Sequence, residues 1–249
     1  MYQRNFFRQI AIDLCRNYYK FIDHLRDYKL GVHSCEEISV QHLTANTSLQ
    51  AQAKKYQATP YKILERVFDT LKPLGLKSHH FIDYGCGMGR VLIEAHLHGY
   101  KNLTGLEISS RALGICNSNL RHYPDLYRRA QLRKLNGADF LPPDEHSVVF
   151  LFNPFSDETM LKVINKLNYS RGHKIVVYVN PIYAFMFKEQ GARLIARENH
   201  FYNDFSFDVY YLPASTAKSN AEINRDSHLT STYGPDSRRS TYLDVISST

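Results

Sequence analysis

The stretch HHFIDYGCGMGRVLIEA, residues 79–95, joins a strand-like segment to an apolar helical segment through glycines at positions 85, 87 and 89. Glycine adopts positive φ angles at little cost and lets a ligand touch the backbone, and the start of the following helix offers unpaired N–H groups. In an open parallel sheet, ligands bind beyond the carboxyl ends of the strands. Residues 83–90 are therefore predicted to form a ligand-binding turn, although a glycine-rich turn alone also occurs without a ligand.

Short apolar runs, separated by helical segments, continue beyond this turn. Five of them have the composition of strands, at residues 81–85, 102–109, 131–139, 148–154 and 174–181, and two further extended segments follow at 192–201 and 207–213. Nearly continuous apolar runs are typical of strands that are buried on both faces, as in a parallel sheet flanked by helices. The pattern therefore predicts an α/β fold built on a parallel sheet.

The composition predicts three regions: an N-terminal helical extension over 1–50, a core domain over 51–213, and a polar tail over 214–249 that is rich in Ser and Thr and predicted to be disordered. In the first region, apolar residues recur at spacings of three and four, as on one face of a helix: Phe7, Ile10, Leu14, Tyr18, Phe21 and Leu25. We expect this face to pack on the core domain. A basic helix on a membrane surface is the alternative, weakened by Asp13, Asp23 and Asp27.

Composition limits the class of protein. The chain has 249 residues, of which 43% are hydrophobic, so it can bury a core. Its four cysteines form no CxxC pair, which argues against a zinc site or a disulfide framework and favours a reducing cytosol. No apolar segment approaches the roughly 20 residues of a membrane span, and the histidines do not form a convincing metal site. We expect a soluble cytoplasmic protein without a metal.

The net charge of +7 permits binding to an anionic partner but does not identify one. Five basic residues lie within fourteen positions: Arg121, Arg128, Arg129, Arg133 and Lys134. This basic segment, 121–134, is a possible phosphate-binding or nucleic-acid-binding surface. A solvated loop and helix end is the simpler interpretation.

The residues around the glycines distinguish between two ligand classes. A dinucleotide fingerprint requires G-x-G-x-x-G, but the sixth position from Gly85 is Arg90. An acid, Asp83, stands two residues before Gly85, where it would repel a pyrophosphate and attract a cation such as the ammonium of an amino acid. The turn therefore favours S-adenosylmethionine over a dinucleotide.

The string D-Y-G-C-G-M-G-R resembles the first motif of class I S-adenosylmethionine-dependent methyltransferases, in particular a bacterial-type subgroup whose fourth motif is Asn-Pro-Phe. The later strand ends are similar to further family motifs: Leu106-Glu107-Ile108-Ser109, Asn136-Gly137-Ala138-Asp139-Phe140, and Phe152-Asn153-Pro154-Phe155. The resemblance implies a Rossmann-like three-layer αβα sandwich with a seven-stranded, mostly parallel sheet of order 3-2-1-4-5-7-6, in which the last strand is antiparallel.

The resemblance also implies roles for individual residues. Glu107 would accept hydrogen bonds from the two ribose hydroxyls, Asp139 and a neighbouring N–H would meet the adenine, and the fourth motif would present the substrate. The implied cofactor-binding residues are Asp83, Tyr84, Gly85, Cys86, Gly87, Gly89, Arg90, Glu107, Ile108, Ala138, Asp139 and Asn153. The implied catalytic residues are Asn153, Pro154 and Phe155.

Methyl transfer from a sulfonium is an in-line displacement that needs alignment of the acceptor and no protein nucleophile. The Asn-Pro-Phe motif resembles the Asn/Asp-Pro-Pro-aromatic motif of amino-methylating family members, although it lacks the second proline, and this resemblance favours a nitrogen acceptor on a protein side chain or a small metabolite. A nucleic acid held by residues 121–134 is a further possibility, although no segment is long enough to supply a DNA-recognition domain. Two other functions stay open: a non-catalytic module that binds S-adenosylmethionine for regulation or interaction, and a nucleotide-binding oxidoreductase.

Overall fold

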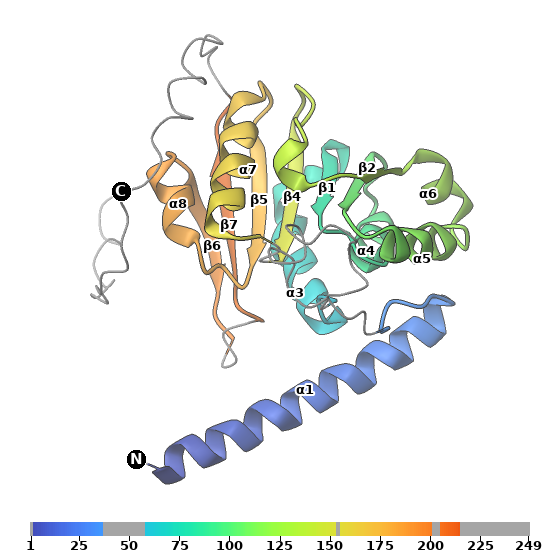
Figure 1. The fold of residues 1–249 in the computed structure, drawn as a ribbon, viewed down its shortest axis with the longest axis vertical. Helices are drawn as coiled ribbons and strands as arrows, with labels where there is room; N and C mark the ends of the chain where they lie inside the picture. The colour runs from blue at the N-terminus through green and yellow to red at the C-terminus, as the bar shows by residue number, and fades with distance from the viewer. Residues whose placement is uncertain (1, 37–57, 153–154, 201–204, 215–249) are drawn as a thin grey trace. The chain divides into compact units, whose positions relative to one another are not determined.

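The computed structural model describes residues 2–36, 58–152, 155–200 and 205–214. A seven-stranded sheet has the order β3-β2-β1-β4-β5-β7-β6 (Figure 1). Its strands are β1 His80–Tyr84, β2 Leu103–Glu107, β3 Gln131–Lys134, β4 Ser147–Phe152, β5 Lys174–Val179, β6 Arg193–Glu198 and β7 Phe207–Leu212. The first five strands pair in parallel, and β7 runs antiparallel to both β5 and β6. The predicted fold class and strand order are confirmed.

Strands β1, β2 and β5 are buried along their whole length, and β4 is buried up to its last residue, as their apolar composition predicts. Successive side chains of a strand point to opposite faces of the sheet, so Phe81 and Ile82 enter two separate apolar cores. The core on one face includes Leu64, Phe68 and Leu92, whereas the core on the other includes Val163 and Leu167, so helices cover both faces.

The helices that supply these side chains are α3 Tyr61–Leu71, α4 Arg90–Leu97, α5 Ser110–Leu120, α6 Pro124–Arg129, α7 Asp157–Tyr169 and α8 Ala184–Glu189. Helices α3 and α4 cover the first core, and α7 and α8 cover the second. Among the described residues, three short 3₁₀ helices join the elements: η2 Lys72–Leu74, η3 Leu76–Ser78 and η4 Gly137–Asp139. Serine N-caps start two of the α-helices, because Ser109 accepts from the N–H of Ala112 and Ser156 from the N–H of Thr159.

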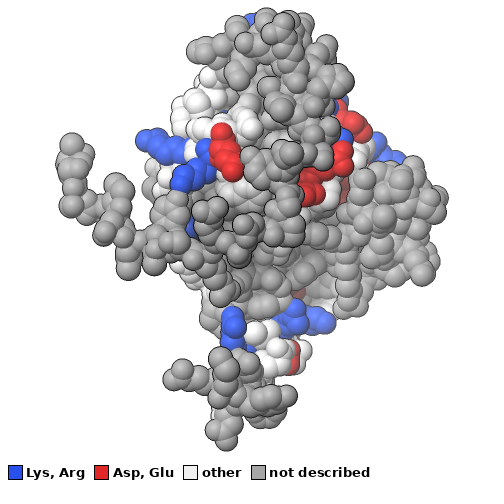
Figure 2. Space-filling model, turned by 60° about the vertical axis from the view of Figure 1, so that its left-hand side comes forward, with Lys and Arg blue, Asp and Glu red and all other residues white. Residues whose placement is uncertain are grey.

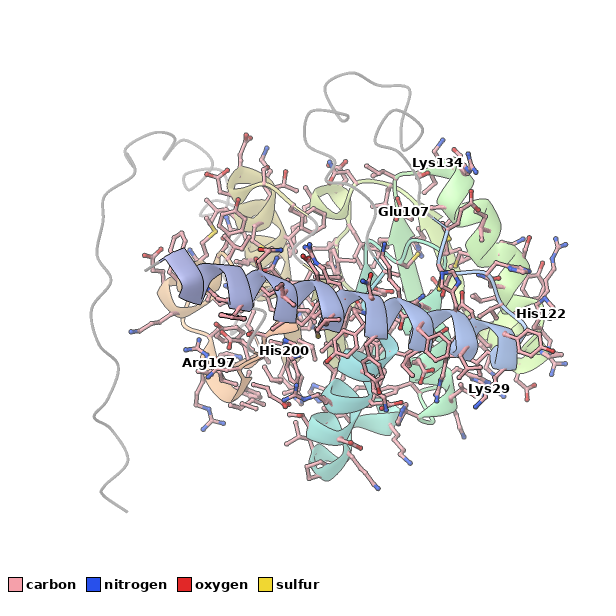
Figure 3. The ribbon with its side chains drawn as sticks, turned by 90° about the horizontal axis from the view of Figure 1, so that it is seen from below. Lys29, Glu107, His122, Lys134, Arg197 and His200 are labelled. Atoms are coloured by element: carbon pink, nitrogen blue, oxygen red, sulfur yellow. The ribbon has the colours of Figure 1, made fainter. Side chains whose placement is uncertain are left out.

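The N-terminal helix α1, Tyr2–Leu30, corrects one prediction. Its apolar face does not pack on the core domain: Leu14 is 65% exposed and Phe21 is 66% exposed. The other side of the helix makes the contacts, with Ile12 and Tyr19 against the first core. In Figure 3, α1 crosses in front of the sheet, passes His200 along its length and ends near His122. Two buried acids on the inward side of α1, Asp23 and Asp27, account for this orientation.

None of the described helices is both long and apolar enough to cross a membrane. Where Figure 2 shows described charged side chains, acidic and basic groups lie interspersed. The chain divides into two units, 1–216 and 217–249. The second unit, and with it nearly all of the predicted tail, lies outside the described residues, as does the segment 37–57.

Candidate active site

The glycine turn follows β1 and is bonded to the end of β2. Gly85, Gly87 and Gly89 have φ angles of 84°, 52° and 88°, which residues with a Cβ rarely adopt. The N–H groups of Gly85 and Cys86 donate to the carbonyl of Leu106 at 2.8 and 2.9 Å. The turn is therefore held at the carboxyl end of the sheet, and α4 starts directly after it.

Glu107 ties the glycine turn to β2. Its Oε2 accepts from the N–H of Gly87 at 3.0 Å, and its Oε1 accepts from the N–H of Ser109 at 2.8 Å. Burial raises the pKa of the Glu107 carboxyl above its usual range, and the backbone donors oppose that shift. Each carboxylate oxygen has capacity for a further hydrogen bond, so Glu107 can accept from a ligand diol while it holds the turn.

Asp83 carries a buried carboxylate oxygen that has no hydrogen-bond partner among the described residues. The residue is 1% exposed, and its Oδ2 is the atom without a partner. Burial raises the pKa of this carboxyl well above its usual value, and the charge of Glu107 adds to the shift. An unpaired buried carboxylate is unfavourable unless it is protonated or meets a donor. Asp83 is therefore suited to a cationic N–H donor of a ligand.

Aromatic rings line the sheet edge beside the turn. Tyr84 contacts Phe140 and Phe155 edge to face, with centroids 6.0 and 6.3 Å away. Gly137 fits against this group, since a Cβ at that position would lie 2.6 Å from Phe155 Cζ and 2.8 Å from Tyr84 Cδ1. The close approach requires glycine at position 137. It places Phe155, from the predicted fourth motif, next to Tyr84, which directly follows Asp83.

The end of β3 continues into η4, where the predicted adenine contacts lie. Asn136 Oδ1 accepts from the N–H of Ala138 at 3.0 Å, and the Asn136 carbonyl accepts from the N–H of Asp139 at 2.9 Å. Both amides therefore already have acceptors within the chain, and the backbone contact to adenine stays a prediction. Ala138 offers its buried methyl, and the exposed side chain of Asp139 keeps its acceptors. The register of β2 and β3 places Lys134 beside Glu107 (Figure 3).

Arg90 is the clearest departure from the predicted site. Its side chain is 2% exposed and stacks over the ring of Tyr61, with Cζ 4.3 Å from the centroid. Its guanidinium donates to Asp23 Oδ2 at 2.6 Å, Ser34 Oγ at 2.8 Å, the Thr59 carbonyl at 3.0 Å and Cys35 Sγ at 3.0 Å. The prediction that Arg90 holds the cofactor is therefore wrong for the guanidinium, which binds the N-terminal extension instead.

The ion pair between Arg90 and Asp23 explains why the polar side of α1 faces inward. Burial lowers the pKa of Arg90, but Asp23 and the other neighbouring anionic groups raise it above its usual range, so the guanidinium stays charged. Burial raises the pKa of Asp23 more than Arg90 lowers it. Asp27, one turn further, accepts from the hydroxyls of Tyr61 and Ser34 at 2.8 and 2.7 Å.

Asn119 is a second tether of the site that no sequence motif indicated. Its Nδ2 donates to the carbonyls of His33 and Met88, both at 2.9 Å, and its Oδ1 accepts from the N–H of His33 at 2.9 Å. Met88 belongs to the glycine turn. The turn is therefore connected to residues 32–36 through both Asn119 and Arg90.

The predicted site residues other than Arg90, Ala138 and Asp139 divide into four groups, one of which is the half-buried Ile108 directly after Glu107. Asp83, the glycines of the turn and Glu107 come together with Tyr84 and Phe155, as described above. Cys86 contributes only its backbone to the turn, because its side chain belongs to the first core. Asn153 and Pro154 lie outside the described residues. Within the described ranges, no group of three or more His, Cys, Asp or Glu side chains could hold a metal ion.

The chain is similar to a protein family and to several solved structures. The family model of Conserved hypothetical protein 95 matches residues 46–210. Among solved structures, yhhF of Escherichia coli, provisionally a methyltransferase, has a TM-score of 0.51 and 17% identity over 66% of this chain and 91% of its own. HI0767 of Haemophilus influenzae, provisionally a methylase, has a TM-score of 0.49 and 20% identity over 63% of this chain and 99% of its own.

A further structural match is magnesium protoporphyrin IX methyltransferase of Synechocystis with bound S-adenosylmethionine, at a TM-score of 0.49 and 13% identity over 80% of this chain and 94% of its own. No curated protein matches the sequence. The family match spans well over half of the chain, and the strand order agrees with it. The chain belongs to the Conserved hypothetical protein 95 family, a methyltransferase-like family with the class I S-adenosylmethionine-dependent fold.

Proposed function

We propose that this protein is an S-adenosylmethionine-dependent methyltransferase whose cofactor lies across the carboxyl ends of β1, β2 and β3. The observation that carries the proposal is the buried Oδ2 of Asp83, which lies at the start of the glycine turn and has no partner in the described part of the chain. The ammonium of the methionine moiety would supply the missing donor. Bound S-adenosylmethionine supplies an activated methyl group, and the protein aligns the acceptor with it.

Two buried acids make this cofactor more suitable than a dinucleotide. Asp83 and Glu107 are close enough that the charge of one raises the pKa of the other. A pyrophosphate would add negative charge beside two carboxylates in a poorly solvated site, which is unfavourable. S-adenosylmethionine instead brings an ammonium for Asp83 and ribose hydroxyls for Glu107. Ala138 and Asp139 are proposed to border the adenine.

The acceptor is proposed to be a nitrogen on a protein side chain or a small metabolite, presented by Asn153, Pro154 and Phe155. Phe155 supports this position, because it packs against Tyr84 next to Asp83. The basic segment offers an alternative surface for a nucleic acid. In the structure Arg128 of that segment already forms an ion pair with Asp125, and Arg133 donates to the side-chain oxygen of Gln131, so a nucleic acid is the less favoured acceptor.

The proposal is tested first by titration calorimetry with S-adenosylhomocysteine and, as a control ligand, NADH. Micromolar binding of S-adenosylhomocysteine alone is the expected result. Asp83→Ala and Glu107→Gln should each weaken binding roughly 10- to 100-fold, since a hydrogen bond to a charged group contributes about 1.5–3 kcal/mol. The matched control is Asp125→Ala, which removes an exposed carboxylate far along the chain from the turn and should leave affinity unchanged.

Unchanged affinity in both site variants, or a preference for NADH, would refute the assignment of the pocket. Catalysis is tested separately by transfer of a labelled methyl group to candidate acceptors. Asn153→Ala should spare S-adenosylhomocysteine binding and slow transfer. Binding without transfer to any acceptor in a cell extract would instead favour the non-catalytic, regulatory module.

A further inference from the structure

Helix α1 presents a row of exposed apolar side chains on the side away from the core. The row, which we call the α1 seam, consists of Ile10, Leu14, Tyr18, Phe21, Leu25 and Tyr28. Leu14 is 65% exposed, Phe21 66% and Tyr28 85%. Isolated exposed apolar residues are common on protein surfaces, but a contiguous row marks an interaction site.

The spacing of the α1 seam is that of a helix that packs against another helix. From Leu14 onward the seam residues follow at intervals of four, three, four and three positions. This alternation repeats every seven residues and keeps a narrow row, with two positions per repeat, on one side of the helix. A helix that lies on a lipid surface instead needs a broad apolar face with abundant basic residues beside it.

The α1 seam cannot turn inward to bury itself on its own domain. The opposite side of α1 is anchored by the buried pair of Asp23 with Arg90 and by Arg26, which forms an ion pair with Glu94 at 2.9 Å. Tyr19 packs on the same side against Phe205, with ring centroids 5.4 Å apart. Rotating the helix would break these contacts and leave buried charges unpaired, at several kcal/mol each. The α1 seam therefore cannot be covered by the core of its own domain, and a binding partner has to cover it.

We propose that the α1 seam is the interface of a homodimer, in which α1 of one protomer packs antiparallel against α1 of a second copy. The area is sufficient. At roughly 200 Å² for each large side chain, the exposed fractions of the seam correspond to about 700 Å² per protomer, close to the roughly 800 Å² per partner of a specific interface. The α1 seam contains no charged residue, so pairing two copies buries no charge.

The α1 seam is also self-complementary in shape. One antiparallel register gives three kinds of apolar layer: Leu14 against Leu25, Tyr18 against Phe21, and Tyr28 against Ala11, an exposed residue beside the seam. The smallest residue thereby meets one of the largest, and a two-fold axis repeats each layer. In this register Ile10 lies at the outer end of the seam. Antiparallel packing also aligns the helix dipoles favourably. The same register brings Arg8 near Lys29 at each outer end, where exposure to solvent screens their repulsion.

The test is the mass of the full chain in solution, measured by analytical ultracentrifugation at tens of micromolar. The wild type is expected at twice the chain mass of 28.9 kDa. Leu14→Glu and Phe21→Glu each place a charge in the seam and should give monomers. The control Gln9→Glu adds the same charge to the same helix outside the seam and should stay dimeric. Far-UV circular dichroism and the urea midpoint establish that each variant is folded.

A rescue experiment tests the pairing itself. Leu14→Lys and Leu25→Glu should each be monomeric alone and form a heterodimer when mixed, because the antiparallel register sets position 14 opposite position 25. A mixture that stays monomeric would overturn this register. A monomeric wild type would overturn the dimer, and its co-sedimentation with vesicles of anionic phospholipid would assign the α1 seam to a membrane surface instead. None of these measurements depends on methyl transfer, so the dimer can fail while the proposed function holds.

Discussion

Arg90→Met is expected to destabilise the folded protein more than any exposed substitution of the same kind. The substitution removes the donors to Asp23, Ser34 and the Thr59 carbonyl and the stacking on Tyr61, and it leaves Asp23 buried without its cation. Breaking one side of a buried ion pair costs about 3–5 kcal/mol, and the lost stacking adds about 1 kcal/mol. We therefore expect a loss of about 4–6 kcal/mol, a large part of the typical 5–15 kcal/mol of total stability.

The assay is urea denaturation followed by far-UV circular dichroism at pH 7. The control is Arg128→Met, which removes an ion pair with Asp125 that is exposed on both sides and should cost less than about 1 kcal/mol. The double variant Asp23→Asn/Arg90→Met should lose at least about 1 kcal/mol less stability than the sum of the losses in the two single variants. The reason is that the double variant contains neither charge of the buried pair, so no buried charge is left unpaired.

The effect should also depend on pH. Burial is the largest influence on the pKa of Asp23, and without Arg90, whose charge and hydrogen bond lower that pKa, the folded-state pKa rises further above its usual value. A raised carboxyl pKa means that the folded state holds a proton which the unfolded state has released, so stability falls as pH rises above about 4. The loss in Arg90→Met should therefore be smaller at pH 5 than at pH 8. A loss below about 1 kcal/mol at pH 8, or no coupling with Asp23→Asn, would refute the role assigned to this pair.

Three further predictions concern the glycine turn and its acids. Because burial raises the pKa of Asp83, the stability of the ligand-free protein should fall between pH 5 and pH 8. In thermal unfolding, Asp83→Asn should flatten this pH dependence and add about 1–3 kcal/mol of stability at pH 8. A steeper pH dependence in the variant would contradict this prediction. If the ammonium of a ligand meets Asp83, the pKa of Asp83 falls on binding and the carboxyl releases a proton to the buffer. The calorimetric enthalpy of S-adenosylhomocysteine binding should therefore differ between phosphate and Tris buffers in the wild type and not in Asp83→Asn. Gly89→Ala should destabilise the folded protein by about 2–3 kcal/mol, because φ at this position is 88° and the new Cβ would lie 2.7 Å from Cys116 Sγ. The control is Gly114→Ala in α5, where a new Cβ would have nothing within 4 Å. In the same urea assay this control should be neutral or stabilise the protein by up to about 1 kcal/mol.

The sheet could be predicted from the sequence because its signals are local. Each strand is a short apolar run, and the glycines at positions 85, 87 and 89 mark the turn without reference to any distant residue. The resemblance to methyltransferase motifs then supplied the strand order, which the structure confirms. The spacing of Leu14 and Phe21 likewise predicted a helix, since periodicity needs only the neighbouring turns of the same helix.

Only the tertiary structure decided what these elements contact. Periodicity showed that α1 has an apolar face, but not that this face points to solvent while Asp23 and Asp27 point inward. That orientation depends on Arg90, which lies 67 residues from Asp23 along the chain. Whether a buried charge finds its counter-ion depends on how distant segments meet in space, and no local pattern records that approach. For the same reason, the sequence alone determined the sheet and the position of the glycine turn, whereas the role of Arg90 and the tether through Asn119 became visible only in the folded protein.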